Sequence, residues 1–172
     1  MRIVTTVQID APLEKVWPLL DEDENLKLWM PDVVETTYPD GKPEGDPVGT
    51  RFVQKIREGG RINIYRGEVT AYEPRRLLGV RLGDGRNFST DVTYRLSEQG
   101  TGTRLDYACD VQLISWLSRV MSLIGGPMMR RIVKRHMANL KRVAARRAGV
   151  PSFGPTMAHS LSRMLACTAI AV

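Results

Sequence analysis

The chain contains only two cysteines and two histidines among its 172 residues, and this scarcity removes several kinds of site. Cys109 and Cys167 lie far apart, so they do not form the clustered pattern of a zinc site. No His-x-x-x-His pair and no His–carboxylate cluster at ligand spacing occurs, so the sequence predicts no metal ion and no other cofactor. The Gly-x-Ser-x-Gly motif that marks many serine hydrolases is absent as well.

Long apolar segments are missing too. No run approaches the roughly 18 apolar residues from which a membrane-spanning helix is built. Residues 1–9 alternate between apolar and polar side chains, unlike the apolar centre of a secretory signal. The cysteine pattern does not point to an oxidising compartment, so we expect a cytoplasmic protein. The length and the 42% of apolar residues fit one domain with a sizeable core.

Acidic residues are missing from one part of the chain. Residues 114–172 contain ten Lys and Arg and no Asp or Glu, a net charge of +10. Residues 1–113 contain 15 Lys and Arg against 19 Asp and Glu, a net charge of −4. The overall charge of +6 therefore averages an acidic body and a purely basic C-terminal part.

Alternation of apolar and polar residues predicts a series of β-strands. The predicted strands are residues 2–9, 33–38, 50–57, 61–72, 76–83, 86–97 and 102–113. Glycine or proline turns separate most of them, at Asp40-Gly41, Gly59-Gly60, Glu73-Pro74, Asp84-Gly85 and Gly100 to Gly102. Because the connections are short, we expect the strands to pair as an antiparallel meander.

Two short helices are predicted between the first two strands. Pro12 can open a helix without losing a hydrogen bond, because the first helical position has no partner for its amide. An apolar stripe follows, made of Leu13, Val16, Trp17 and Leu20. Pro18 should shorten or kink this helix. The acidic run of residues 21–24 is predicted to be a loop, and residues 25–30 a second helix that ends before Pro31.

A long amphipathic helix is predicted after the last strand. Residues 116–124 form one apolar stripe, and Gly125-Gly126-Pro127 is expected to break the helix into two hinged pieces, the first acting as a gate. The second piece, about 20 residues long, has an apolar stripe of Met129, Ile132, Val133, His136, Met137, Leu140, Val143 and Ala144. We expect residues 1–147 to form the domain and residues 148–172 a weakly structured tail.

This order of elements implies an internal cavity. One long helix cannot cover both faces of such a sheet, so the sheet must curl around the helix. The space left between them is the natural candidate site. The residues expected to line it are Trp29, Met30, Tyr65, Phe88, Tyr94, Tyr107, Met121, Met128 and Met137. The alternative for each of them is that it simply fills the core.

Five short motifs, in this order, resemble one known superfamily. They are residues 7–17 (Val-Gln-Ile-Asp-Ala-Pro-Leu-Glu-Lys-Val-Trp), 28–33 (Leu-Trp-Met-Pro-Asp-Val), 48–50 (Val-Gly-Thr), 102–105 (Gly-Thr-Arg-Leu) and 139–141 (Asn-Leu-Lys). The sequence is similar in these segments to the START-like helix-grip superfamily, also called SRPBCC, and within it to the polyketide cyclase/dehydrase-like branch. The resemblance covers roughly residues 3–147.

The resemblance implies an α+β helix-grip fold. Its parts are a curved antiparallel sheet of about six or seven strands, a long C-terminal helix that the sheet wraps, and two short helices after the first strand. It also implies a cavity for lipids, polyketides, sterols or other hydrophobic ligands. Some members are cyclases or dehydratases, whereas others bind or carry a ligand or assist a partner protein. The fold therefore does not choose between an enzyme and a binder.

The primary hypothesis is binding or transport of a hydrophobic small molecule, such as a lipid or a polyketide-like compound, because no catalytic constellation is evident. The alternative is a polyketide cyclase, aromatase or dehydratase. Such an enzyme would need polar groups inside the cavity, and His136, Tyr94 and Tyr107 are the candidates. A histidine on an apolar helix stripe is more often a structural core residue, and His159 in the tail is taken as incidental.

The basic side of the long helix is a separate candidate surface. It carries Arg130, Arg131, Lys134, Arg135, Lys141 and Arg142. It could be a solvated face, or the acidic body could neutralise it. It could also meet an anionic membrane surface or an acidic partner protein. Nucleic acid is disfavoured, because no aromatic residues interleave with the charges. The sequence is compatible with a monomer and with a dimer.

Overall fold

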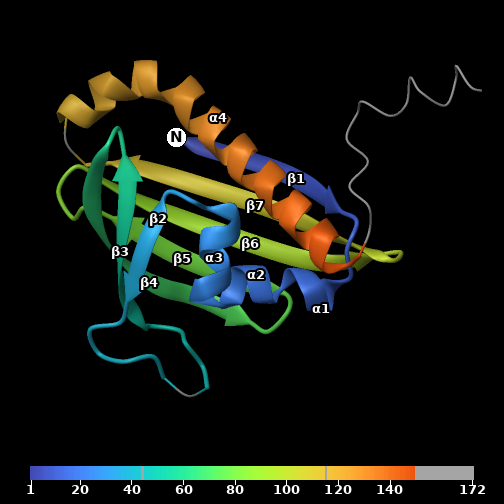
Figure 1. Cartoon of the computed structure of the whole chain (residues 1–172). Coiled ribbons are helices and arrows are strands. Elements are labelled where there is room, and N and C mark those ends of the chain that lie inside the picture. The colour runs from blue at the N-terminus through green and yellow to red at the C-terminus, as the bar shows by residue number, and fades with distance from the viewer. Residues whose placement is uncertain (44, 115, 150–172) are drawn as a thin grey trace, which may run out of the picture.

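A computed structural model of the protein describes residues 1–43, 45–114 and 116–149 (Figure 1). Almost all of the predicted tail lies outside these residues. The same holds for the side chain of Met121 and its neighbours at the start of the last helix, although their backbone is helical.

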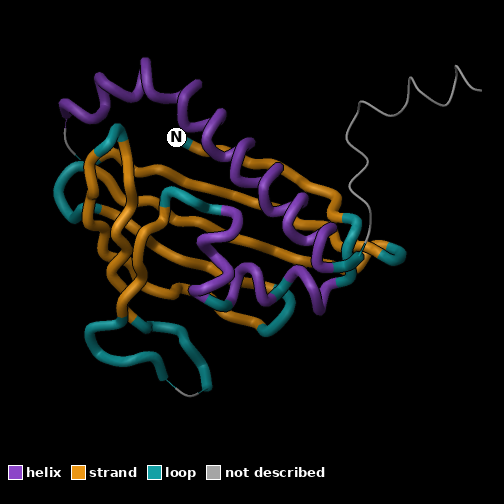
Figure 2. Tube along the Cα trace, viewed as in Figure 1, coloured by secondary structure: helices purple, strands orange, loops and turns teal. Residues whose placement is uncertain are grey.

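Seven antiparallel strands form one sheet in the order β1-β7-β6-β5-β4-β3-β2, which confirms the expected meander and the α+β fold class. The strands are β1 (Arg2–Ile9), β2 (Val33–Thr37), β3 (Arg51–Glu58), β4 (Arg61–Glu73), β5 (Leu77–Gly83), β6 (Phe88–Gln99) and β7 (Gly102–Leu113). β1 pairs with β7, so the first and last strands of the chain are neighbours. Figures 1 and 2 show β2 and β3 running steeply across the direction of β1 and β7, which makes the sheet strongly curved.

The alternation of each strand decides which side chains face the helix. On β7, Leu105, Tyr107, Cys109 and Val111 are all buried. The residues between them point the other way, and Asp106 on that outer side accepts a hydrogen bond from Thr6 of β1 at 2.6 Å. The concave face is therefore apolar and the convex face polar, as expected for a sheet that packs on one side.

Three short helices, rather than two, follow β1: α1 (Leu13–Val16), α2 (Pro18–Asp21) and α3 (Asp23–Trp29). The expected interruption at Pro18 is confirmed, since this proline starts α2. The prediction of a loop over residues 21–24 was wrong, because Glu22 alone separates α2 from α3. Asp23 and Glu24 occupy the first turn of α3, where the partial positive charge of the helix terminus favours carboxylates.

The last helix, α4 (Trp116–Arg147), is continuous. The prediction that Gly125-Gly126-Pro127 breaks it was therefore wrong, and Pro127 lies inside the helix. A proline inside a helix removes one backbone hydrogen bond and crowds the preceding turn, which kinks the helix. Figure 1 shows this outcome: the N-terminal turns of α4 lie at an angle to its long C-terminal part.

The core lies where the C-terminal part of α4 covers the sheet and the short helices. Leu140 and Ala144 of α4 are completely buried, and Leu19 of α2 and Leu105 of β7 are as well. Trp29, at the end of α3, is 1% exposed and donates a hydrogen bond from Nε1 to the Leu19 carbonyl oxygen at 2.7 Å. This packing fixes α3 between α4 and the sheet, and the candidate site begins beside Trp29.

Candidate ligand cavity

A cavity of about 180 Å³ lies between the concave face of the sheet, the helices α2 and α3, and the middle of α4. Most of its wall is apolar and is formed by Leu20, Leu26, Trp29, Met30, Phe52, Val69, Leu78, Val80, Leu82, Val92, Val133 and Met137. An engineered core cavity of about 150 Å³ is large enough to bind benzene. The space therefore suits a small molecule built around one or two rings.

Phe52 reaches the cavity because the strand beside it carries a glycine. Phe52 of β3 lies directly opposite Gly67 of β4. A Cβ atom at position 67 would stand 2.3 Å from Cζ of the Phe52 ring. The missing side chain thus leaves room for the Phe52 ring beside Gly67, and this role of Gly67 was not recognised from the sequence.

Three aromatic rings form one end of the wall. The ring centroid of Tyr94 lies 6.2 Å from that of Trp29 and 5.3 Å from that of Tyr107, both in edge-on arrangements. Each of the three residues is at least 91% buried. The structure thus brings together Trp29, Met30, Tyr94, Tyr107 and Met137 of the nine expected cavity residues.

Three other expected residues are placed elsewhere, so their assignment to the cavity wall was wrong. The rings of Tyr65 and Phe88 meet edge-on, with their centroids 5.6 Å apart. They lie near the end of the sheet where β4 and β6 begin and do not line the cavity. Met128 is 66% exposed. It lies nine residues before Met137, which is two and a half helical turns and therefore the opposite side of α4.

Both cavity tyrosines are weakly acidic. Burial raises the pKa of Tyr94 and of Tyr107 far above the ordinary value of a phenol. The Tyr107 hydroxyl contacts the thiol of Cys109 on the same strand. Neither hydroxyl can serve as a base near neutral pH, because neither ionises there, but both remain hydrogen-bond donors.

His136 lines the cavity with its ring, which meets Trp29 edge-on at 6.4 Å between centroids. Its Nε2 atom is fully buried, lies 3.5 Å from Oδ2 of Asp32, and forms no hydrogen bond with any described residue. Burial lowers the pKa of His136, and the neighbouring Asp32 carboxylate partly opposes this. At neutral pH the imidazole is therefore uncharged, with Nε2 turned towards Asp32.

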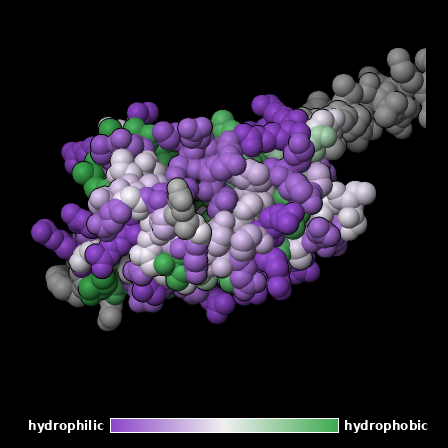
Figure 3. All heavy atoms as spheres, turned by 90° about the horizontal axis from the view of Figure 1, so that it is seen from below, coloured by the Kyte–Doolittle hydropathy of each residue, from purple (hydrophilic) through white to green (hydrophobic). Residues whose placement is uncertain are grey.

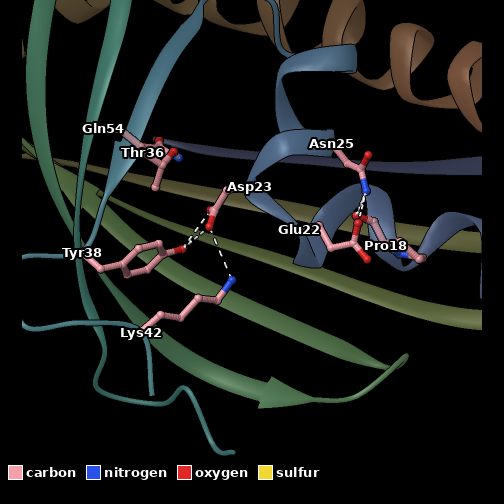
Figure 4. Close-up of polar contacts among 8 residues, drawn as sticks. All are labelled: Pro18, Glu22, Asp23, Asn25, Thr36, Tyr38, Lys42 and Gln54. Carbon is pink, nitrogen blue, oxygen red and sulfur yellow. Dashed lines mark hydrogen bonds and ion pairs between the residues drawn. The ribbon is translucent and has the colours of Figure 1, made fainter. Parts of the chain in front are cut away.

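Polar side chains also line the cavity, and Figure 4 shows the contacts among several of them. The Tyr38 hydroxyl donates to both carboxylate oxygens of Asp23, at 2.8 and 2.9 Å, and Nζ of Lys42 lies 3.4 Å from Oδ2 of the same residue. Nε2 of Gln54 lies 3.4 Å from Oγ1 of Thr36. The Asp23 contacts join α3 to the segment after β2. No local pattern in the sequence pointed to them, because the partners lie 15 and 19 residues apart.

The face of the molecule seen from below is mostly polar. Figure 3 shows the face seen from below, where hydrophilic side chains dominate and apolar ones form small separate groups. Among the described residues, no helix is long and apolar enough to cross a bilayer. Within the same residues, no three His, Cys, Asp or Glu side chains gather as they would around a metal ion.

The basic side of α4 divides into paired and unpaired charges. Arg135 forms an ion pair with Asp32, and Nζ of Lys141 lies 3.1 Å from Oδ2 of Asp10, so the acidic body neutralises part of this side. Arg142 donates to the side-chain oxygen of Asn139 at 3.3 Å. The remaining three cations, Arg130, Arg131 and Lys134, are exposed and have no acidic partner in the part of the chain that the structure describes.

The fold is shared with solved structures of low sequence identity. Protein MLL2253 from Mesorhizobium loti is 20% identical, with a TM-score of 0.62 over 85% of this chain and 98% of that one. TTHA0849 from Thermus thermophilus is 18% identical, with a TM-score of 0.64 over 84% and 97%. The di-domain ARO/CYC protein StfQ from the steffimycin biosynthetic pathway is 11% identical, with a TM-score of 0.70 over 87% of this chain and 52% of that one.

At these identities the likeness establishes the fold alone. No curated protein matches the sequence. The sequence does match a family, described as "Polyketide cyclase / dehydrase and lipid transport", over residues 1–145. This match covers every strand, the three short helices and nearly all of α4. The chain belongs to this polyketide cyclase/dehydrase and lipid transport family, as its resemblance to the SRPBCC superfamily implied.

Proposed function

We propose that the protein binds a small, ring-containing hydrophobic molecule in the cavity and holds or carries it without chemical change. The observation that carries this proposal is the cavity of about 180 Å³, whose wall is mostly apolar. The family description, which joins cyclases and dehydrases to lipid transport, is compatible with this role. Burial of an apolar ligand there contributes about 25 cal/mol for each Å² of apolar surface removed from water.

Binding is favoured over catalysis by the state of the polar groups in the wall. The Asp23 carboxylate is held by Tyr38 and Lys42, at the polar end of the cavity. Nε2 of His136 is turned to Asp32 and is not accessible to solvent. The cavity tyrosines do not ionise near neutral pH, because burial raises their pKa. Among the described cavity residues, the two tyrosines therefore act as hydrogen-bond donors and not as bases, and the unpaired nitrogen of His136 is closed off from solvent.

The experiment fills the cavity and measures binding of a probe of suitable size. Val92 lies on the inner side of β6, so Val92→Phe should occupy the ligand space and abolish binding of indane, followed by NMR titration. The matched control is Val4→Phe, at a position 62% exposed on β1, which should bind indane like the wild type. If the wild type binds no indane, or if Val92→Phe binds it equally well, the proposal is wrong. If the wild type binds indane and Val92→Phe does not, native mass spectrometry of protein purified from cells would identify the natural ligand.

An enzymatic role is the alternative, as a polyketide cyclase, aromatase or dehydratase. The observations in its favour are the structural likeness to the ARO/CYC protein StfQ and the presence of Tyr94, Tyr107 and His136 at one cavity. Turnover of an aromatic polyketide-like substrate would support it. Unchanged turnover after alanine substitution of all three residues would exclude them as the catalytic groups.

The outer side of α4 supports a second role, docking on an anionic membrane from which a hydrophobic ligand could be taken. Arg130, Arg131 and Lys134 are exposed, and Met128 close to them in the chain is exposed too and could enter the lipid boundary. Each basic residue near an anionic bilayer contributes about 1 kcal/mol. We favour a membrane over nucleic acid because an exposed apolar side chain such as Met128 can enter the lipid boundary, whereas it has no such partner on a phosphate backbone.

Vesicle sedimentation tests this role. Reversing the three charges (R130E, R131E and K134E) should weaken binding to phosphatidylserine-containing vesicles by roughly 100-fold or more. The control reverses three exposed cations of β3 and β4, with R51E, R57E and R61E, and should bind as the wild type does. Equal loss in both variants would show a non-specific charge effect. Binding to DNA but not to vesicles would assign the surface to nucleic acid instead.

A further inference from the structure

Thr36 of β2 and Gln54 of β3 form a polar pair in the wall of the cavity (Figure 4). They lie directly opposite each other in the sheet, and both side chains are half-buried. Nε2 of Gln54 donates to Oγ1 of Thr36 at 3.4 Å, which is longer than the length of about 2.9–3.0 Å that such bonds usually have. The pair therefore presents polar atoms to whatever occupies the cavity.

The alternation of β3 turns Gln54 towards the inside. Phe52, two residues earlier on the same side of the strand, is buried and lines the cavity as well. Lys55, the residue after Gln54, points the other way and forms an ion pair with Glu35. A polar side chain on the inner side of a strand costs free energy unless it is hydrogen-bonded. An amide at this position therefore calls for a polar partner.

The pair uses only part of its hydrogen-bonding capacity. The Gln54 amide has two N–H donors and a carbonyl oxygen, and the Thr36 hydroxyl can donate as well as accept. Within residues 1–43, 45–114 and 116–149, the contact between the two is the one side-chain hydrogen bond that either forms. It leaves the Gln54 carbonyl oxygen as an acceptor and the Thr36 hydroxyl as a donor. The Asp23 carboxylate, which also lines the cavity, is by contrast engaged by Tyr38 and Lys42.

The chemistry of the missing partner follows from these two groups. A purely apolar ligand would displace water from them without replacing its hydrogen bonds, which weakens binding. A hydroxyl group replaces both bonds, because it can donate to the Gln54 carbonyl oxygen and accept from the Thr36 hydroxyl. A carbonyl group could only accept, and an ammonium group would bring a full charge against a mostly apolar wall.

We propose that Gln54 and Thr36 bind a hydroxyl group of the cavity ligand, which makes the ligand a ring-containing phenol or cyclic alcohol. This inference rests on the proposed function, since it needs a ligand in the cavity. It adds the orientation of that ligand. The hydroxyl group lies at β2 and β3, and the ring lies against the aliphatic side chains of Val80 and Val92, which are directly opposite each other on β5 and β6 and line the cavity.

The test uses two probes that differ only by the hydroxyl group, 5-indanol and indane. Dissociation constants are measured by NMR titration for the wild type and for Gln54→Leu, which replaces the amide by an apolar side chain. We expect Gln54→Leu to weaken binding of 5-indanol by about three- to tenfold, the effect of one hydrogen bond. Binding of indane should be unchanged or slightly tighter. The matched control is Gln112→Leu, at an exposed position of β7, which should alter neither constant.

Thr36→Val provides a second variant, which keeps the shape of the side chain and removes its hydroxyl. It should weaken binding of 5-indanol by a similar or smaller factor than Gln54→Leu and leave indane binding unchanged. The backbone NMR spectrum of each variant shows whether the native fold is kept. If Gln54→Leu loses the fold, Thr36→Val decides the question by itself.

The outcomes separate this inference from the function on which it rests. If indane binds to the wild type but 5-indanol does not, or if neither substitution weakens 5-indanol, the cavity binds ligands and the role of Gln54 and Thr36 is wrong. If the substitutions weaken both probes equally, the two residues contribute packing and not hydrogen bonds, and the inference also falls. If neither probe binds to the wild type, both proposals are overturned.

Discussion

The two sides of α4 have the same backbone and opposite surroundings. On the inner side, Val133, Met137, Leu140 and Ala144 recur at spacings of three and four residues and are at least 94% buried. On the outer side, Arg131, Lys134 and Ala138 recur at the same spacings and are exposed. One side closes the cavity and the core, and the other meets solvent or a partner. The helical period alone separates the two tasks along the same stretch of chain.

The difference also shows where charge can be tolerated in this fold. His136 lies between the two sides, with its ring at the cavity and its Nε2 atom facing Asp32. Arg135, the residue before it, pairs with the same carboxylate. Asp32, between α3 and β2, thus lies at the edge of the apolar interior, where the side chains of α4 change from apolar to charged. Three changes test how sharply the two sides differ.

The largest effect is expected for Leu140→Ala on the inner side. Leu140 is completely buried, so the substitution should lower the free energy of unfolding by about 2–5 kcal/mol. Met128→Ala on the outer side, where the side chain is 66% exposed, should change it by less than about 0.5 kcal/mol. Urea unfolding followed by circular dichroism measures both. Equal effects would show that α4 does not pack through the side that we assign.

A smaller effect is expected at the boundary, as a dependence on pH. Burial lowers the pKa of His136 in the folded state below its ordinary value of 6.5, so the unfolded chain takes up the proton first as the pH falls. The contribution of a neutral His136 is therefore complete above pH 6.5 and is lost progressively below it. We expect the stability of the wild type to fall more steeply than that of His136→Gln between about pH 7 and pH 5. Parallel curves would contradict the lowered pKa.

The smallest effect is expected on the outer side. Arg131→Ala and Lys134→Ala remove exposed cations without a described acidic partner, so each should change the free energy of unfolding by less than about 0.5 kcal/mol. The same urea experiment measures this. Loss of more than that from either variant would mean that the outer side contributes to folding, and the surface would then be less free for a membrane than we propose.

Much of the fold could be predicted from local pattern. The seven strands, the interruption at Pro18 and the amphipathic nature of α4 follow from residue periodicity and turn residues, and the structure confirms them. The break at Gly125-Gly126-Pro127 and the loop over residues 21–24 were wrong. At Pro127 the helix continues through the proline, and Asp23 and Glu24 occupy the first turn of α3, where carboxylates are favourable.

The site was predicted only in part. Tyr94, Tyr107 and Met137 lie in the middle of inward-facing strand sides and helix stripes and line the cavity, because periodicity fixes the side to which they point. Tyr65 and Phe88 also belong to strands of the expected sheet, but they lie near the ends where β4 and β6 begin, beyond the cavity. Periodicity tells which way a side chain points but not how far along the sheet the cavity extends.

By itself the sequence determined the order of the elements, the split between an acidic body and a basic last helix, and the family to which the chain belongs. These features depend on residues close together in the chain. Tertiary structure alone decided that Asp23, Tyr38 and Lys42 meet at one end of the cavity. It also decided that the rings of Trp29, Tyr94 and Tyr107 pack together in the cavity wall. The reason is physical: such contacts join segments whose distance in space is set by the curvature of the whole sheet, and no local pattern encodes that curvature.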